Sequence, residues 1–223
     1  MTKSNWITIV NRAAGGGKAE KEWPLISQLL HQHQVPFEPH FTNRRLHASI
    51  IARNKIKEGY SKIIVVGGDG TMNEVINGVF AQKRLQTTEV MLGMISVGTG
   101  NDWARMFNIP VDYEGAVQTI KQQKTFIQDA GLVSYRKNGK EWKRSFINIA
   151  GMGFGARVVE RSNRMKDKGK SGPFLFRDKS RFDISLIPGG KQVLLGPVNR
   201  DDLSGWLPSA DHVALSQLSA SRT

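Results

Sequence analysis

Hydrophobic residues in the first hundred positions fall into short apolar runs separated by stretches with helical spacing. Four segments have the length and composition of β-strands: residues 6–10, 35–42, 62–66 and 91–97. Between them, apolar residues recur on one helical face from residue 18 onward, over residues 46–56 and over residues 72–80. This alternation predicts an open parallel α/β sheet with right-handed crossovers.

Two of the predicted strands have a definite place in that sheet. The continuous apolar run at residues 62–66 is typical of a strand buried on both faces. Pro36 and Pro39 remove backbone donors from the segment 35–42, so we expect that strand at an edge. Ligands of such sheets lie at the carboxyl ends of the strands, where glycine-rich turns follow at residues 67–70 and 98–100.

The pattern changes after residue 124 and indicates a second domain. Residues 126–135 and 142–149 read as antiparallel strands, joined through Asn138 and Gly139, a dipeptide that accepts positive φ at both positions. We therefore predict a nucleotide-binding α/β domain over residues 1–125, and the start of an incomplete antiparallel β-rich domain over residues 126–176. Residues 177–223 form a tail without periodicity or motif.

Composition limits the classes of protein that fit this pattern. The 223 residues are 39% hydrophobic and 23% charged, as in soluble globular proteins, and the absence of cysteine excludes disulfides and thiolate metal sites. No stretch approaches the roughly 20 apolar residues that span a bilayer. We expect a cytoplasmic protein that associates peripherally with membranes.

The net charge of +13 is concentrated in one segment. Residues 131–181 contain 14 Lys/Arg and 4 Asp/Glu, a net charge of +10. Such a segment suits an anionic membrane surface or a nucleic acid, and a solvated basic face is the plain alternative. No nucleic-acid recognition motif accompanies the charge, so we expect a membrane surface and no nucleic acid as partner. A homodimer is left open.

The turn Gly67-Gly68-Asp69-Gly70-Thr71 joins a buried strand to a helix and suits a polyphosphate. Glycines let the backbone approach phosphate closely, and the amides at the start of the helix point toward the anion. Thr71 is suited to cap the helix or to bond a phosphate oxygen. Asp69 would hold Mg²⁺ directly or through water. An ordinary turn that uses Asp and Gly for geometry is the alternative.

A second loop, Gly98-Thr99-Gly100-Asn101-Asp102, follows the next strand in the same way. It is suited to sugar hydroxyls, phosphate or the acceptor substrate, or else serves as a capping turn with Asn101 or Asp102 as the cap. The sequence contains neither a Walker A motif nor the glycine-rich loop and His-Arg-Asp triplet of protein kinases.

Together these motifs resemble the bacterial-type diacylglycerol kinase catalytic family, which shares its nucleotide fold with sphingosine and ceramide kinases. The Gly-Gly-Asp-Gly-Thr turn alone also occurs in NAD kinases and phosphofructokinases, whereas its combination with Gly-Thr-Gly-Asn-Asp and Asp-x-Gly is specific to the lipid kinases. The matching positions run in family order through about residue 176: Asn11, Gly15–Gly17, Thr42, Gly67–Glu74, Gly98–Asp102, Asp129–Gly131 and Asn148–Gly155.

The resemblance implies ATP and Mg²⁺, with transfer of the γ-phosphoryl group to a lipid hydroxyl such as that of diacylglycerol. It places Asp69 at the catalytic centre and Asp129 as a second carboxylate in the Mg²⁺–water network, although Asp129 also suits a strand-end turn. It assigns nucleotide contacts to Asn11, Gly15, Thr42, Gly67, Gly68, Asp69, Gly70, Thr71, Met72, Asn73 and Thr99. It assigns the neighbourhood of the acceptor to Gly98, Gly100, Asn101 and Asp102.

The resemblance fades soon after residue 176, where the family continues into the rest of its β-rich second domain. That domain supplies a glutamate general base and a structural metal site. We expect that the gene is truncated or frameshifted near residue 177, or that the tail is disordered, because pattern and basic charge both end there. The alternatives are an NAD or sphingoid-base kinase, and a non-catalytic nucleotide-binding remnant with a membrane-facing basic segment.

Overall fold

The structure is a computed structural model that describes residues 3–98 and 101–148. Among these residues, contacts define one unit that contains residues 3–131 and 145–148, and a second that contains residues 132–144. Residues 149–155 of the matching stretch Asn148–Gly155 and the tail 177–223 lie outside the described residues.

The first unit contains a four-stranded parallel sheet with the order β2-β1-β3-β4. Its strands are β1 (Trp6–Val10), β2 (Phe37–Phe41), β3 (Lys62–Gly67) and β4 (Met91–Ser96). The predicted parallel α/β fold is therefore confirmed. The strand with two prolines in its segment lies at an edge, as its missing backbone donors led us to expect.

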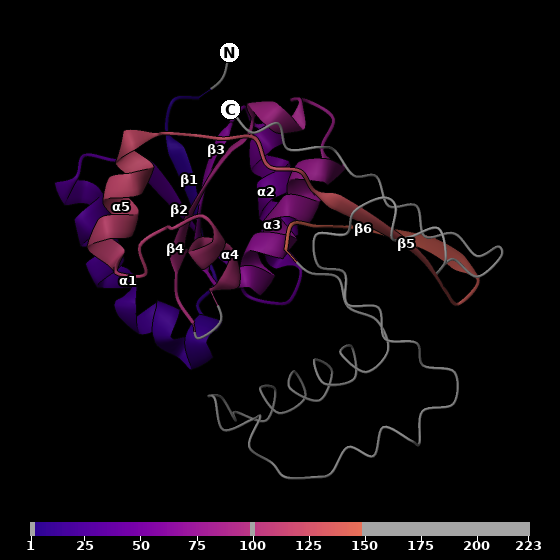
Figure 1. The fold of residues 1–223 in the computed structure, drawn as a ribbon, viewed down its shortest axis with the longest axis horizontal. Coiled ribbons are helices and arrows are strands. Elements are labelled where there is room, and N and C mark those ends of the chain that lie inside the picture. The colour runs from indigo at the N-terminus through magenta and orange to yellow at the C-terminus, as the bar shows by residue number, and fades with distance from the viewer. Residues whose placement is uncertain (1–2, 99–100, 149–223) are drawn as a thin grey trace, which may run out of the picture. The chain divides into compact units, whose positions relative to one another are not determined.

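Helices cover both faces of the sheet. Figure 1 shows α1 (Ala14–Gln32) and α5 (Tyr113–Gln122) on one side, with α2 (His47–Lys57) and α3 (Asp69–Ala81) on the other. Residues of β3 alternate between the two hydrophobic cores, Ile63 and Val65 in one and Ile64 and Val66 in the other. All four side chains are fully buried, which confirms the prediction for this apolar run.

The helices α2 and α3 pack closely because a glycine lies between them. A Cβ atom added to Gly78 would lie 2.4 Å from the carbonyl oxygen of Ser49 and 2.9 Å from the Cβ atom of Ala52. No side chain fits in that space without moving α2. This contact fixes the position of α3, whose first turn carries the predicted phosphate-binding motif.

The structure contains two helices, α4 and α5, that we did not predict from the sequence. Helix α5 begins after Asp112, whose carboxylate accepts a hydrogen bond of 2.7 Å from the Gly115 amide. Both the capping residue and the helical spacing of Ala116, Val117 and Ile120, which the structure buries, are sequence features that indicate a helix. The short helix α4 (Asp102–Met106) and a 3₁₀ turn (Thr87–Glu89) complete the first unit.

The antiparallel pair β5 (Gly131–Lys137) and β6 (Lys140–Phe146) forms the predicted hairpin. Asn138 and Gly139 adopt φ values of 52° and 74°, as their sequence indicated. The predicted first strand started too early, because residues 124–130 are in no regular element and the pairing begins at Gly131. No helix in the described part of the chain is long and apolar enough to cross a bilayer.

Candidate functional site

Three glycine-containing turns meet at the carboxyl edge of the sheet, after β1, β3 and β4. A Cβ atom added to Gly15 would lie 3.5 Å from Val97 Cγ1 and 3.7 Å from the Cα atom of Gly98. A Cβ atom added to Gly68 would lie 3.9 Å from the Val97 carbonyl oxygen. The glycines therefore let Gly15 approach the backbone of Gly98 and let Gly68 approach that of Val97, and a close approach of backbone segments suits a polyphosphate.

The first of these turns has a backbone that other residues rarely adopt. Gly15, Gly16 and Gly17 have consecutive φ values of 63°, 70° and 90°, all in the left-handed region. They interrupt the start of α1, whose regular helical part begins only at Lys18, the residue where the sequence predicted it. An L-residue at these positions would be strained, so the turn depends on glycine.

Within the Gly67–Thr71 turn, the structure corrects one part of the prediction. Gly68, in an extended conformation, is the N-cap of α3, and its carbonyl oxygen accepts the Thr71 and Met72 amides at 2.9 and 3.1 Å. Thr71 does not cap the helix, because it already lies in its first turn. Its side chain packs against Gly67 instead, and a Cβ atom added to Gly67 would lie 2.6 Å from Thr71 Oγ1.

Asp69 joins the two predicted loops. Its Oδ2 accepts the backbone amide of Asp102 and its Oδ1 that of Trp103, both at 3.1 Å. These amides begin α4, whose own N-cap residue, Asn101, has φ 57° and forms no side-chain cap. Asn101 therefore occupies the N-cap position that the sequence offered as an alternative, but the carboxylate that accepts these amides comes from Asp69, 33 residues before Asp102. The contact aligns Asp69 with a helix N-terminus, where negative charge is favoured.

A polar network joins three of the predicted nucleotide contacts. Asn11 Nδ2 donates to Thr71 Oγ1 at 2.9 Å, and Thr42 Oγ1 donates to Asn11 Oδ1 at 3.4 Å. The amide of Asn11 also donates to the Val66 carbonyl oxygen at 3.0 Å. Asn11 thus ties the ends of β1, β2 and β3 to the first turn of α3. Thr42 and Thr71 are both buried, so their hydroxyls act first within this network.

The remaining predicted residues occupy varied environments. Met72 is fully buried in the core, so its backbone would have to supply a nucleotide contact, and Asn73 accepts hydrogen bonds from Asn77. Asp129 is exposed, and among the described residues it forms no hydrogen bond or ion pair. Thr99 and Gly100 lie outside the described residues. The part of the chain that the structure describes contains no group of three or more His, Cys, Asp or Glu arranged to hold a metal.

Sequence reasoning assigned no role to two polar residues of α3 that hold distant segments. The carboxylate of Glu74 accepts the amides of Leu46 and Ala48, at 2.9 and 3.3 Å, and so caps the start of α2. Asn77 accepts the Ser145 amide at 3.0 Å and donates to the Ser145 carbonyl oxygen at 2.9 Å. Glu74 ends the matching stretch Gly67–Glu74, but nothing in the sequence indicated its partner or that of Asn77.

An apolar groove of about 640 Å³ lies along β4, the edge strand nearest the second loop. Trp103 lines it, and the backbone amide of Trp103 donates to Asp69, so the groove and the predicted site share a residue. The indole Nε1 donates to Gln128 Oε1 at 2.8 Å, which fixes the ring. Further lining residues include Phe80, Leu92, Phe107, Phe126 and Ile127, of which Phe80, Phe126 and Ile127 are exposed.

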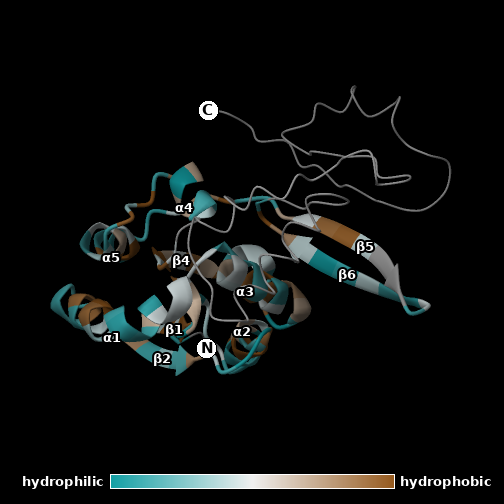
Figure 2. Cartoon of the chain, turned by 90° about the horizontal axis from the view of Figure 1, so that it is seen from below, coloured by the Kyte–Doolittle hydropathy of each residue, from teal (hydrophilic) through white to brown (hydrophobic). Residues whose placement is uncertain are grey.

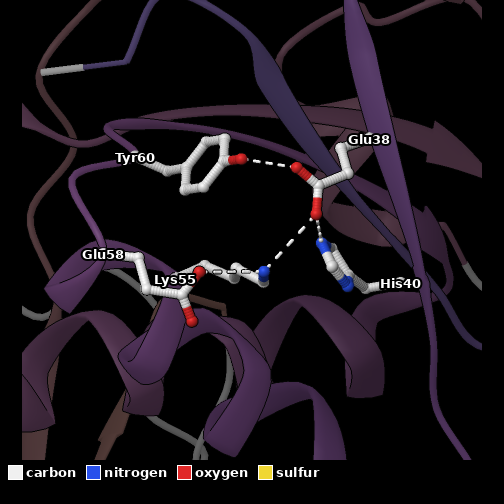
Figure 3. Close-up of polar contacts among 5 residues, drawn as sticks. All are labelled: Glu38, His40, Lys55, Glu58 and Tyr60. Carbon is white, nitrogen blue, oxygen red and sulfur yellow. Dashed lines mark hydrogen bonds and ion pairs between the residues drawn. The ribbon is translucent and has the colours of Figure 1, made fainter.

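A titratable cluster lies at the opposite edge of the sheet, on β2 and α2 (Figure 3). The Glu38 carboxylate accepts a hydrogen bond from the Tyr60 hydroxyl and lies 2.9 Å from His40 Nε2 and 3.4 Å from Lys55 Nζ. The Tyr60 bond lowers the pKa of Glu38, and burial lowers the pKa of His40. A 2.9 Å contact with Glu58 raises the pKa of Lys55. None of these residues contacts the glycine turns.

Comparison with known proteins places this arrangement in a known group. Residues 5–133 match the family described as the diacylglycerol kinase catalytic domain. The chain is 31% identical over 187 residues to a diacylglycerol kinase of Staphylococcus haemolyticus (strain JCSC1435), a match that covers 83% of this chain and 51% of the relative. It is 33% identical over 143 residues to one of Staphylococcus carnosus (strain TM300), covering 63% and 41%.

Solved structures resemble the fold as well. A crystal structure of a diacylglycerol kinase from Bacillus anthracis str. Sterne superposes with a TM-score of 0.52 at 24% identity, covering 75% of this chain and 55% of that one. This likeness concerns the fold alone. The chain spans about half the length of the curated relatives it matches.

Proposed function

Because the chain belongs to the diacylglycerol kinase catalytic domain family, a family of phosphotransferases, we propose that it binds ATP at the three glycine turns and serves the phosphorylation of a lipid hydroxyl. The observation that carries this proposal is the carboxylate of Asp69, held between the first turn of α3 and the amides of Asp102 and Trp103. It lies where the turns after β1, β3 and β4 approach one another.

The backbone of the turns supports a polyphosphate seat. The amides at the start of any helix have no partner within that helix, and here α3 begins inside the Gly67–Thr71 turn. Gly70 is exposed, and a Cβ atom added there would meet nothing within 4 Å of the protein. The space above the turn is therefore open to a ligand. Asn11 would hold the turn in shape through its bond to Thr71.

The donors near the turns fit Mg²⁺. This ion keeps several waters and binds proteins through one or two carboxylates together with substrate phosphates, so it needs no cluster of three acidic residues. Asp69 supplies one carboxylate, and each of its oxygens has a further lone pair beyond the amide bond that it accepts. When bound, Mg²⁺ would neutralise charge on the phosphates. Asp69 would act chiefly by position and charge.

The groove along β4 favours a lipid as the acceptor over a dinucleotide. It is lined mainly by apolar and aromatic side chains and reaches Trp103, whose amide is bonded to Asp69. Such a surface suits the acyl part of diacylglycerol, whose hydroxyl would then approach the second loop. NAD, which is polar throughout, gains little from it. A sphingoid base would use the same apolar contacts.

A second candidate function is nucleotide binding without phosphoryl transfer. The match covers about half of each curated relative, and the contacts described above concern the nucleotide turns. In this candidate the chain binds nucleotide and transfers no phosphate. This candidate requires the same contacts of Asn11, Asp69 and Thr71 as the first. The two differ in whether phosphate is transferred when an acceptor is present.

Radiolabelled ATP with Mg²⁺, offered with diacylglycerol, sphingosine or NAD as acceptor, tests the proposal. Labelled phosphatidic acid is the expected product, and Asp69→Asn should abolish it. Nucleotide binding without transfer to any acceptor would establish the second candidate. A chain that binds no ATP, or an Asp69→Asn protein with the original transfer rate, would contradict the proposed site.

A further inference from the structure

The β5–β6 hairpin exposes a large aromatic side chain between basic ones. Strand β6 runs from Lys140 to Phe146, and Trp142 in its middle has 51% of its surface exposed. Since side chains alternate along a strand, Lys140, Trp142 and Arg144 lie on one face of β6. Lys140 is exposed and Arg144 half-buried. Figure 2 shows hydrophilic colours along much of β6 beside hydrophobic residues of β5.

On the opposite face of β6, one basic and one acidic side chain neutralise each other. Glu141 and Lys143 form an ion pair at 3.6 Å, with about three-fifths of each side chain exposed. On the Trp142 face, by contrast, neither Lys140 nor Arg144 forms an ion pair with any described residue. Over residues 131–146 the sequence contains five Lys/Arg and one acidic residue. Among the basic side chains of β6, the two without an ion pair therefore lie on the face that carries the exposed indole.

An exposed tryptophan between basic side chains is typical of protein surfaces that bind at a membrane–water interface. Tryptophan favours the headgroup region because its ring is apolar while its N–H can still bond polar groups there. Each Lys or Arg near an anionic leaflet strengthens binding about fivefold, the equivalent of the attraction expected per charge. A two-stranded ribbon has little core of its own to cover an indole. We propose that the Lys140–Trp142–Arg144 face of β6 docks on an anionic bilayer surface.

The proposal concerns residues of β6 that are not among those of the nucleotide turns, so it does not depend on the proposed catalytic function. An exposed basic face also suits a nucleic acid, whose phosphates attract the same charges. The bilayer is favoured because half of the Trp142 surface is exposed in a small hairpin and no recognition motif for nucleic acid accompanies it. The two partners are separated by experiment.

Sedimentation of the full 223-residue chain with sucrose-loaded vesicles tests the proposal. Vesicles of phosphatidylcholine and phosphatidylglycerol at a ratio of three to one should bind the chain, and vesicles of phosphatidylcholine alone should not. Lys140→Gln with Arg144→Gln should lower the partition coefficient about 25-fold, fivefold for each charge. Trp142→Ala should lower it roughly tenfold, as expected for an apolar side chain removed from an interface.

A matched control removes two charges elsewhere. Lys83 and Lys121 are exposed and, within the described residues, form no ion pair, so Lys83→Gln with Lys121→Gln makes the same change in net charge. This double variant should change binding less than twofold. Equal losses for both double variants would show an attraction of the whole basic protein and overturn the proposal.

Two further readouts cover the other outcomes. Brominated lipids should quench the tryptophan emission of the unmodified chain, and Trp142→Phe should remove most of that quenching although four other tryptophans remain. Quenching that survives in Trp142→Phe would overturn the placement. The variant Lys140→Gln with Arg144→Gln is also tested with a short RNA or DNA duplex. If it loses duplex binding but binds vesicles as the unmodified chain does, the face binds nucleic acid instead of a bilayer.

Discussion

The carboxylate of Asp69 bonds the backbone amide of Trp103, 34 residues further along the chain, at 3.1 Å. The same carboxylate also accepts the Asp102 amide, so one side chain at the start of α3 caps the start of α4. This gives Asp69 a structural role in addition to the one proposed in phosphoryl transfer. Both roles need a carboxylate at this position, and they can be separated because only one of them involves ATP.

Asp69→Asn should lower the free energy of unfolding by about 1 kcal/mol, within the range for loss of a helix cap. An amide has one acceptor oxygen, so it can satisfy one of the two backbone N–H groups that the carboxylate now binds. Urea denaturation measures the change. Asp102→Asn is the control, because its exposed carboxylate has only a 3.8 Å contact with Arg105 and should matter little. Equal stability of Asp69→Asn and the unmodified chain would refute the capping role.

Gly70→Ala should stabilise the fold and weaken ATP binding. Gly70 is the second residue of α3, where alanine is favoured by up to about 1 kcal/mol, and its added Cβ atom would meet no protein atom within 4 Å. In the proposed seat that Cβ atom would meet phosphate, so ATP affinity should fall at least tenfold, or about 1.4 kcal/mol. Calorimetry and thermal unfolding measure the two effects.

Gly67→Ala provides the contrast to Gly70→Ala. Its Cβ atom would lie 2.6 Å from Thr71 Oγ1, so we expect destabilisation by about 1–3 kcal/mol before any ligand is added.

For Gly70→Ala, an unchanged ATP affinity would mean that phosphate does not lie over the turn.

Local patterns were enough to predict most of the sheet. The run Ile63 to Val66 has four consecutive apolar β-branched residues, which only a strand between two helical layers can bury. Asn138 and Gly139 predicted their turn because positive φ is a property of those residues themselves. The parallel direction of the strands followed from the alternation of strands and helices. Each of these signals is contained within a few residues of sequence.

The contacts that shape the candidate site could not be predicted in the same way. Asp69 with Trp103, and Asn77 with Ser145, join residues 34 and 68 positions apart, and no periodicity connects them. The motif around Asp69 indicated a nucleotide site but not that its carboxylate would cap α4. A polar side chain can form a hydrogen bond with many distant backbone groups. Which of them becomes its partner depends on how the helices pack.

Asn77→Ala should release the end of β6. The Asn77 amide group pairs with both the N–H and the C=O of Ser145, as another strand would, and Ser145 is buried. Without it, two backbone groups lose their partners at a cost of about 1–3 kcal/mol. Hydrogen exchange of the Ser145 amide should accelerate. In Asn77→Asp the acceptor oxygen remains, so exchange there should stay slow, and equal acceleration in both variants would contradict the pairing.

The cluster around Glu38 should make the stability of the α/β domain depend on pH. The hydrogen bond from Tyr60 lowers the pKa of Glu38 below its ordinary value of 4.5, so the stabilisation is present above that pH and is lost as the pH falls through the folded-state value. Burial lowers the pKa of His40 below 6.5, so the folded state disfavours its protonation, and stability again falls with falling pH. Both groups act in the same direction.

Glu38→Gln should therefore destabilise the protein at pH 7 by up to about 1 kcal/mol, the scale of a partly exposed ion pair. Its deficit should shrink toward pH 4, because a protonated glutamate, like glutamine, carries no charge to attract Lys55. Thermal unfolding of both proteins between pH 4 and pH 7 measures this. Tyr60→Phe, which removes the donor to Glu38, should show the same convergence. A deficit that is constant with pH would mean that packing, and not the charge of Glu38, stabilises this edge of the sheet.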